Sequence, residues 1–191
     1  MSWLPEPVVE LIRIALVTEL TVVRADGRPI TYPLIPMWDS DRIVMTSSIL
    51  FSRKLEHLKN NGRVSLSFSD PVALGGRRDR ATVQGDAIVI DGDPHTDWER
   101  TLPLWSAKEP VILHFLKARV AFPLFFERSV IEVVPTRAYY WPDGDTTQPP
   151  QITTAPPPTT KAARTASTVR PMRPGRVLAL SRRVFIVPSR G

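Results

Sequence analysis

Cysteine is absent from the 191-residue sequence, and histidine is scarce. Without cysteine the chain can form no disulfide, no thiolate metal site and no cysteine nucleophile. The three histidines, His57, His95 and His114, stand in unrelated contexts, and the sequence contains neither a G-x-S-x-G nucleophile elbow nor an H-E-x-x-H metal-binding helix. These absences argue against a hydrolase, and the sequence assigns no catalytic residue.

The sequence also lacks a long apolar run. No segment approaches the roughly 18 to 20 apolar residues of a membrane span, and the N-terminus has neither the basic start nor the apolar core of a secretory signal. There is no G-x-G-x-x-G motif that opens a βαβ unit, and there is no Walker P-loop. We therefore expect a cytoplasmic protein with no membrane partner and no nicotinamide-binding Rossmann domain.

Acidic residues are missing from residue 146 onward, although the whole chain carries a net charge of +6. Eight of its 25 Lys and Arg residues lie there, so 17 basic residues remain against 19 acidic ones in residues 1–145. The basic segment is rich in Pro, Thr and Ala, a composition that buries too little apolar surface to fold alone. We predict a folded domain over 1–145 and a flexible basic tail over 146–191, and we expect contact with nucleic acid, if any, only through that tail.

Two β-prone runs interrupt this tail, Val177–Leu180 and Val184–Val187. They could add a terminal strand to the domain or to a partner subunit, bind an acidic surface, or hang free. The sequence leaves these alternatives open.

Strand-like segments dominate what the sequence does contain. Alternating or β-branched apolar residues predict strands over 18–24, 29–38, 43–45, 64–68, 81–91 and 128–140. Pro33 and Pro36 place the second strand at an edge or on bulges, and Gly85 predicts a bulge. Apolar residues at helical spacing predict helices after Pro5, after Ser52 and around Trp98–Trp105. The pattern is typical of a mainly β fold with about six mostly antiparallel strands and flanking helices.

A polar hinge lies between the strand at 43–45 and the helix that follows it. Hydroxyls and a basic pair stand side by side there: Thr46, Ser47, Ser48, Ser52, Arg53 and Lys54. Because the unpaired amides of the helix's first turn would point the same way, an anion would meet neutral donors and two cations together. The alternative is that Ser52 caps the helix and that the basic pair is solvated surface charge.

The order of these elements resembles the signature region of a known family. A strand, Thr-Ser-Ser, Arg-Lys and Leu-Lys-Asn-Asn-Gly-Arg-Val-Ser-Leu-Ser follow one another over residues 42–67, as in the pyridoxamine 5′-phosphate oxidase-like split barrels. The resemblance implies a homodimeric split β-barrel that binds FMN, or alternatively the deazaflavin coenzyme F420, at the dimer interface. It also implies that the strand-end hydroxyls and the basic pair hold the cofactor phosphate, namely Thr46, Ser47, Ser48, Arg53 and Lys54.

The same resemblance suggests four further cofactor contacts. Met37 and Trp38 lie on the strand that flanks the flavin ring in that family, although one of them could instead face the core. Gln84 precedes the glycine of a strand that the family packs beside the cofactor. Arg137, near the end of the closing strand, is a candidate contact to the dimer-related cofactor or else an exposed strand charge.

The resemblance predicts a flavin-dependent oxidoreductase that passes hydride or electrons to a small-molecule substrate. A deazaflavin-dependent reductase of the same fold is the first alternative. A non-catalytic module that binds flavin, haem or a metabolite is the second. The segment Asp91–Asp97 is interpreted as a turn and helix cap, so we expect no metal site.

Overall fold

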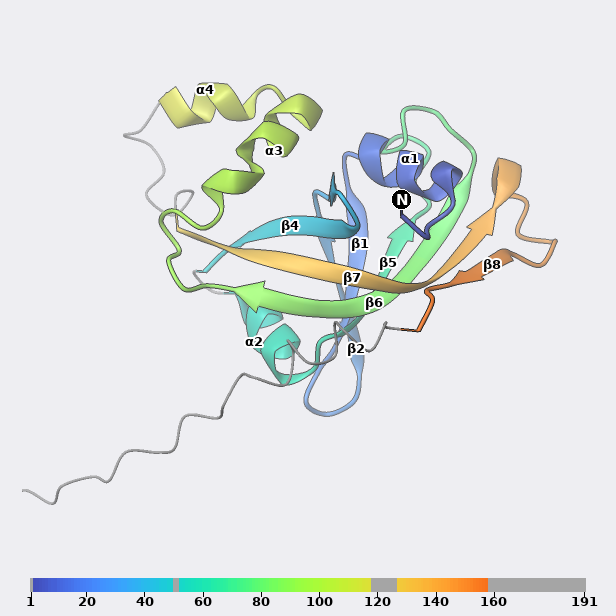
Figure 1. Cartoon of the computed structure of the whole chain (residues 1–191), viewed down its shortest axis with the longest axis horizontal. Helices are drawn as coiled ribbons and strands as arrows, with labels where there is room; N and C mark the ends of the chain where they lie inside the picture. Colours follow the sequence, from blue (N-terminus) through green and yellow to red (C-terminus); the bar gives the residue numbers. More distant parts are fainter. Residues whose placement is uncertain (1, 50–51, 118–126, 158–191) are drawn as a thin grey trace, which may run out of the picture. The chain divides into compact units, whose positions relative to one another are not determined.

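The computed structural model describes residues 2–49, 52–117 and 127–157. Over these residues the chain forms an eight-stranded sheet in which every pairing is antiparallel (Figure 1). The mainly β fold is therefore confirmed, with eight strands where about six were expected. The strands are β1 (Thr18–Val23), β2 (Pro29–Leu34), β3 (Met37–Asp39), β4 (Arg42–Ser48), β5 (Arg63–Phe68), β6 (Arg80–Ile90), β7 (Arg128–Trp141) and β8 (Gln151–Thr154).

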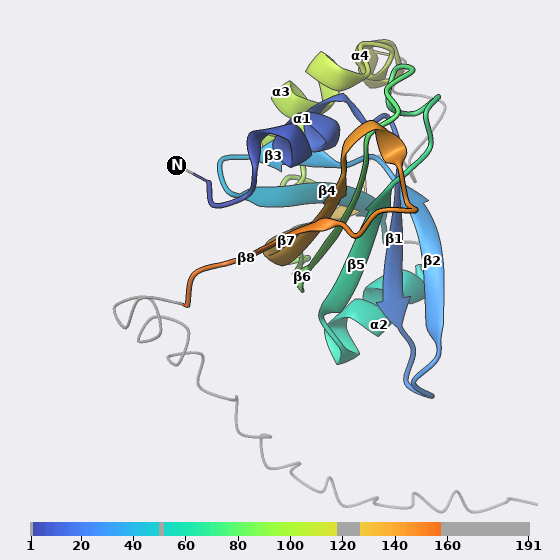
Figure 2. The same cartoon turned by 90° about the vertical axis from the view of Figure 1, so that its right-hand side faces the viewer.

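The two ends of the sheet are neighbours in the chain, which closes the sheet into a barrel. The strand order is β2-β1-β5-β6-β7-β4-β3, yet only Ile35 and Pro36 separate β2 from β3. So short a connector spans only about 10 Å, so the sheet must curl to bring its ends together. Figure 2 shows this curvature from the side.

The single strand predicted over 29–38 is wrong, because the structure divides it into β2 and β3. Pro36 between them lacks the N–H that a continuous ladder needs. The expectation of an edge position is confirmed, since β2 ends the sheet order and, among the strands of residues 2–49, 52–117 and 127–157, pairs only with β1. The predicted bulge is also confirmed, because the register of β6 against β7 shifts between Gln84 and Gly85. A Cβ on Gly85 would lie 2.5 Å from the carbonyl oxygen of Val134.

The barrel interior is filled by apolar side chains of the strands and of α1 (Glu6–Ile14). The helix expected after Pro5 is confirmed, and its apolar side chains Val8, Leu11 and Ile12, with Ala15 at its end, are fully buried. The helix packs across the barrel near the start of β1 (Figures 1 and 2).

A second, smaller core lies on the outer face of the sheet. It consists of Met37, Val44, Trp98, Trp105, Ile112 and Val130. The helical segment formed by η1 (Glu99–Thr101), α3 (Leu102–Lys108) and α4 (Ile112–Lys117) supplies Trp105 and Ile112, and Trp98 directly precedes it. Successive strand residues point to opposite faces, so Val44 reaches this core while Ile43 and Met45 reach the barrel interior. The middle of β4 is consequently buried on both faces.

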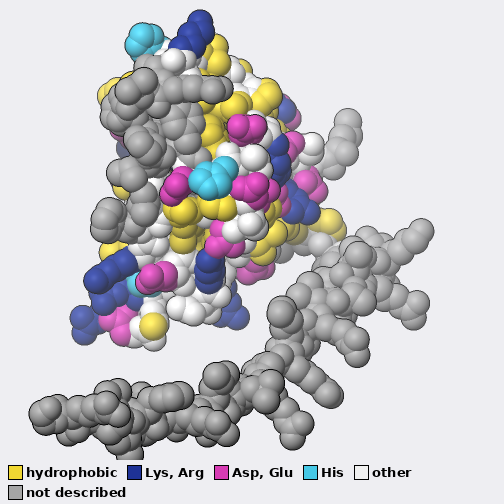
Figure 3. Space-filling model, turned by 90° about the vertical axis from the view of Figure 1, so that its left-hand side faces the viewer, with side chains coloured by type: hydrophobic (Ala, Val, Ile, Leu, Met, Phe, Trp, Pro, Cys, Tyr) yellow, Lys and Arg dark blue, Asp and Glu magenta, His cyan; other side chains and the backbone are white. Residues whose placement is uncertain are grey.

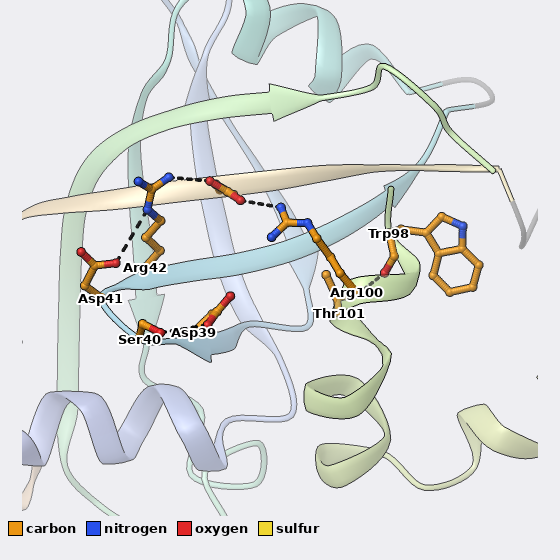
Figure 4. Close-up of polar contacts among 8 residues, drawn as sticks. Asp39, Ser40, Asp41, Arg42, Trp98, Arg100 and Thr101 are labelled. Atoms are coloured by element: carbon orange, nitrogen blue, oxygen red, sulfur yellow. Dashed lines mark hydrogen bonds and ion pairs between the residues drawn. The ribbon is translucent and has the colours of Figure 1, made fainter. Parts of the chain in front are cut away.

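An ion-paired clamp fastens the helical segment to the sheet. Glu132 of β7 is 7% exposed and accepts hydrogen bonds from Arg42 of β4, at 2.6 Å, and from Arg100 of η1 (Figure 4). Burial acts to raise the pKa of Glu132, but hydrogen bonds and positive charge from the two arginines outweigh it and lower the pKa. The clamp therefore fixes where η1 and α3 lie on β7.

The sheet extends beyond the boundary expected at residue 145. β8 pairs with the second half of β7, from Arg137 against Thr154 to Tyr140 against Gln151, and the compact unit ends at Pro156. The β-prone runs at 177–180 and 184–187 lie outside the described residues. None of the helices in the described part of the chain is long and apolar enough to cross a membrane.

Candidate functional site

The end of β4 and the start of α2 (Arg53–Asn60) are joined by a hydrogen-bonded cluster around Ser47. The Ser47 side chain is buried; its Oγ donates to the backbone oxygen of Ser48 at 3.1 Å and lies 3.1 Å from Oγ of Ser52. Lys54 reaches back from the first turn of α2, and its Nζ donates to Ser47 Oγ at 2.9 Å. Hydroxyls and a cation that are neighbours in sequence are thus also neighbours in space.

Ser52 does not act as a side-chain cap. It stands at the N-cap position of α2 but makes no side-chain capping hydrogen bond, and its hydroxyl instead contacts Ser47. The alternative interpretation of Ser52 as an ordinary capping residue is therefore not what the structure shows. The orientation of Ser52 ties the helix start to the strand end.

Lys54 is half-buried, with Nζ 5.7 Å from the centre of the Tyr32 ring. Burial lowers the pKa of Lys54, and the positive charge of Arg128 lowers it further. Both effects disfavour the ammonium form. A bound anion would oppose both of them.

Arg128 is the functional candidate that the sequence analysis missed. It is the first residue of β7 and lies opposite Ser48 in the β4–β7 ladder. Its Nε donates to Oγ1 of the buried Thr46 at 3.0 Å, and its guanidinium lies 4.9 Å from the centre of the Trp105 ring. Burial lowers the pKa of Arg128 to about 10. Arg128 lies far from residues 46–54 in the sequence, and only the pairing of β7 with β4 brings it close to them. No short sequence motif predicts this contact.

Lys54 and Arg128 approach the end of β4 from its two faces. Thr46 and Ser47 are consecutive strand residues, so the hydroxyl that Arg128 contacts and the one that Lys54 contacts point in opposite directions. The positive charge of Arg128 lowers the pKa of Lys54 in addition to the effect of burial. We call these two cations with Thr46, Ser47 and Ser52 the hinge cluster.

A pocket of about 450 Å³ opens beside the hinge cluster. Ser52 and the exposed Arg53 line it, together with Ser129, the register partner of Ser47. Ser129 is fully buried, and its hydroxyl has no hydrogen-bond partner among the described residues. Glu56 and an ion pair between Lys59 and Asp91 also line the pocket. A buried hydroxyl without a partner, in a pocket that Arg53 also lines, suits a ligand that brings acceptor oxygens.

Basic side chains gather around this region at the surface as well. Figure 3 shows Lys and Arg at the lower edge of the folded domain, with a few acidic side chains among them. In Figure 1, α2 lies at the lower end of the domain, and it carries Arg53, Lys54 and Lys59 with Glu56 between them. The chemistry of the donors, two cations and several hydroxyls, fits a phosphate group.

Met37 and Trp38 lie in two different surroundings. Met37 is 2% exposed and belongs to the second core, which is the alternative that the sequence analysis left open for one of the two residues. Trp38 is partly buried and lines a separate pocket of about 270 Å³ with Arg13 and Lys108. Three backbone carbonyls hold the Lys108 ammonium, and burial lowers the pKa of Lys108 to about 8.

Gln84 and Arg137 lie opposite each other on β6 and β7, and both are exposed. Gln84 lines a third pocket, of about 480 Å³, on the outer face of the sheet beside the Gly85 bulge. Nη1 of Arg137 lies 3.4 Å from the hydroxyl of Tyr139. Neither residue contacts the hinge cluster within this chain.

The loop from Asp91 to Asp97 is a closed turn. Asp93 accepts hydrogen bonds from the His95 amide and the Thr96 hydroxyl, and Asp97 accepts one from the Asp93 amide. Within residues 2–49, 52–117 and 127–157, no group of three His, Asp or Glu side chains is arranged to hold a metal ion.

Comparisons with known proteins identify the fold. No protein-family model matches the sequence, and no curated protein matches it. Many solved structures are similar to this chain, and three of them show the range of the proteins that share its fold. An F420 reductase has a TM-score of 0.52 at 20% identity, over 71% of this chain and 98% of that one. A pyridoxamine 5′-phosphate oxidase-related, FMN-binding protein from Nostoc punctiforme has a TM-score of 0.53 at 15% identity, over 82% and 98%.

The third structure is the haem storage protein HutZ from Vibrio cholerae, with a TM-score of 0.50 at 19% identity, over 71% of this chain and 91% of that one. Sequence identities this low carry information about the fold and not about activity. The chain therefore has the fold of the pyridoxamine 5′-phosphate oxidase-like split barrels, as the resemblance in its sequence predicted.

Proposed function

We propose that the protein binds FMN through its phosphate at the hinge cluster and acts as a flavin-dependent oxidoreductase on a small molecule. The observation that carries the proposal is the pair of partly buried cations, Lys54 and Arg128, held against hydroxyls at the end of β4. Burial lowers the pKa of both, and Arg128 also lowers that of Lys54. A phosphate dianion would offset these costs with charge-assisted hydrogen bonds.

In this proposal the protein supplies the binding site and FMN, when bound, supplies the transfer of hydride or electrons. Lys54 and Arg128 neutralise the phosphate, Thr46 and Ser47 orient the two cations, and the Ser129 hydroxyl is a further donor beside them. No side chain is assigned to a proton-transfer step.

A second copy of the chain is the proposed partner. Exposed apolar side chains on the outer face of the sheet support it: Ile88 is 51% exposed and Val134 43%. Both flank the outward-facing Gln84 and Asp86 on paired strands. Apolar side chains exposed on a sheet face are common at contacts between subunits.

The deazaflavin coenzyme F420 is the second candidate cofactor. Arg53 favours it, because this exposed cation lies in the 450 Å³ pocket next to the hinge cluster and could pair with a longer anionic tail. The similarity to an F420 reductase is consistent with this candidate. A non-catalytic module that binds flavin, haem or a metabolite is the third possibility, and it differs from the first two by the absence of turnover.

Titration of the purified apo-protein with FMN, and separately with the deazaflavin, tests the proposal through cofactor fluorescence. We expect Lys54→Gln to weaken FMN binding roughly ten- to a hundredfold, because a hydrogen bond to a charged group contributes about 1.5 to 3 kcal/mol. Arg24→Gln is the control. This exposed cation pairs with Asp26 in the turn after β1 and does not line the 450 Å³ pocket, so we expect less than a roughly twofold change. Equal FMN affinity in the Lys54 variant and the wild type would refute the phosphate assignment.

A further inference from the structure

We propose that Trp105 is a positioning residue that orients Arg128 for anion binding, so that the helical segment η1–α3 controls the affinity of the hinge cluster. The proposal rests on the proposed function and adds to it a residue that does not itself touch the anion. Trp105 is 5% exposed, and its ring centre lies 4.9 Å from the guanidinium carbon of Arg128.

Two contacts constrain the guanidinium from different sides. The Thr46 hydroxyl accepts a hydrogen bond from Nε at 3.0 Å, and the Trp105 ring lies against the guanidinium, a cation–π contact. An arginine recognises phosphate through a planar fork of N–H donors, so the orientation of that plane decides whether the fork meets the ligand. The Trp105 ring thus affects anion binding indirectly, because it sets the orientation of the Arg128 guanidinium.

Trp105 is itself held firmly. It packs edge-on against the buried Trp98, with ring centres 6.4 Å apart and planes inclined by 73°. Its indole Nε1 donates to Glu109 at 3.4 Å, at the end of the same helix. The ring therefore cannot turn independently of α3.

The same helical segment grips β7 at a second point. Arg128, Val130 and Glu132 alternate along β7 and face the same side of the sheet. Arg100, at the start of the segment, binds Glu132, while Trp105 covers Arg128 (Figure 4 shows the first of these contacts). A shift of η1–α3 along β7 would consequently change the contact with Arg128, whereas the Lys54 half of the hinge cluster would keep its own support from Ser47 and Tyr32.

A double-mutant cycle on the full-length protein tests the inference, with FMN affinity measured by flavin fluorescence in four proteins: wild type, Trp105→Leu, Arg128→Gln and the double variant. We expect Trp105→Leu alone to weaken FMN binding by roughly two- to thirtyfold, the range that loss of a cation–π contact implies. In the Arg128→Gln background we expect the same change to have no further effect. Trp105→Phe keeps an aromatic face and should restore most of the affinity.

The outcomes separate this inference from the proposed function. If Arg128→Gln leaves FMN affinity unchanged, Arg128 is not part of the anion site, and the proposed function loses one of the two cations of the hinge cluster. If Arg128→Gln weakens binding but Trp105→Leu has no effect, or an equal effect in both backgrounds, the positioning role is wrong while the anion site stands. If the Trp105→Leu variant does not fold, the same cycle is carried out with Trp105→Phe. The expected loss of FMN affinity is then smaller, and it must also be absent in the Arg128→Gln background.

Discussion

Two clusters of charge lie on β4 and β7, and they differ in how their charges are compensated. At the clamp, the buried carboxylate of Glu132 meets two arginines, and its pKa is lowered, which means that the fold favours the charged form. At the hinge cluster, Lys54 and Arg128 have the same sign, and the pKa of each is lowered, which means that the fold disfavours the charged form. We therefore expect the first cluster to stabilise the protein, whereas the second, in the proposed function, would gain from an added anion.

Removing both cations of the hinge cluster is expected to have the largest effect. Lys54→Gln with Arg128→Gln should weaken FMN binding at least about a hundredfold, because both charge-assisted contacts to the phosphate are lost. The thermal stability of the apo-protein should stay equal or rise, since two partly buried like charges are gone. Fluorescence titration and thermal unfolding measure the two quantities. A large loss of stability with intact FMN affinity would show that the hinge cluster is structural, like the clamp.

Breaking the clamp should lower the stability of the protein and leave its FMN affinity nearly unchanged. Glu132→Gln is expected to lower the free energy of unfolding by about 2 kcal/mol. Loss of one partner from a fully buried ion pair would cost more, but both arginines are 44% exposed, so water can hydrate them in the variant. For a chain of this size the melting temperature should fall by about 4 to 8 °C. FMN affinity should change only through any movement of η1–α3. An unchanged melting temperature would mean that the clamp contributes nothing.

The smallest expected effect is a difference in acid stability between wild type and Glu132→Gln. The pKa of Glu132 lies below its ordinary value of 4.5 in the folded protein, so its stabilising contribution is complete above about pH 4.5 and is lost as pH falls through the lowered pKa. Urea unfolding of both proteins from pH 6 to pH 3 should show a steeper loss of stability in the wild type. Parallel curves would contradict the assigned role of the carboxylate.

Local chemistry in the chain was sufficient to predict much of this molecule. The helix after Pro5, the bulge at Gly85 and the run of hydroxyls followed by Lys54 could all be predicted from the sequence. Each depends on residues within a few positions of one another, where backbone preference and side-chain spacing act directly.

The tertiary contacts of those elements could not be predicted from the sequence. Arg128 stands 82 positions from Thr46, and Glu132 stands 90 from Arg42, yet the antiparallel register of β4 and β7 brings each pair into contact. The division of 29–38 between opposite ends of the sheet and the pairing of β8 with β7 arose in the same way. Strand pairing depends on which distant segments bury apolar surface together, and a short sequence pattern carries no information about that choice.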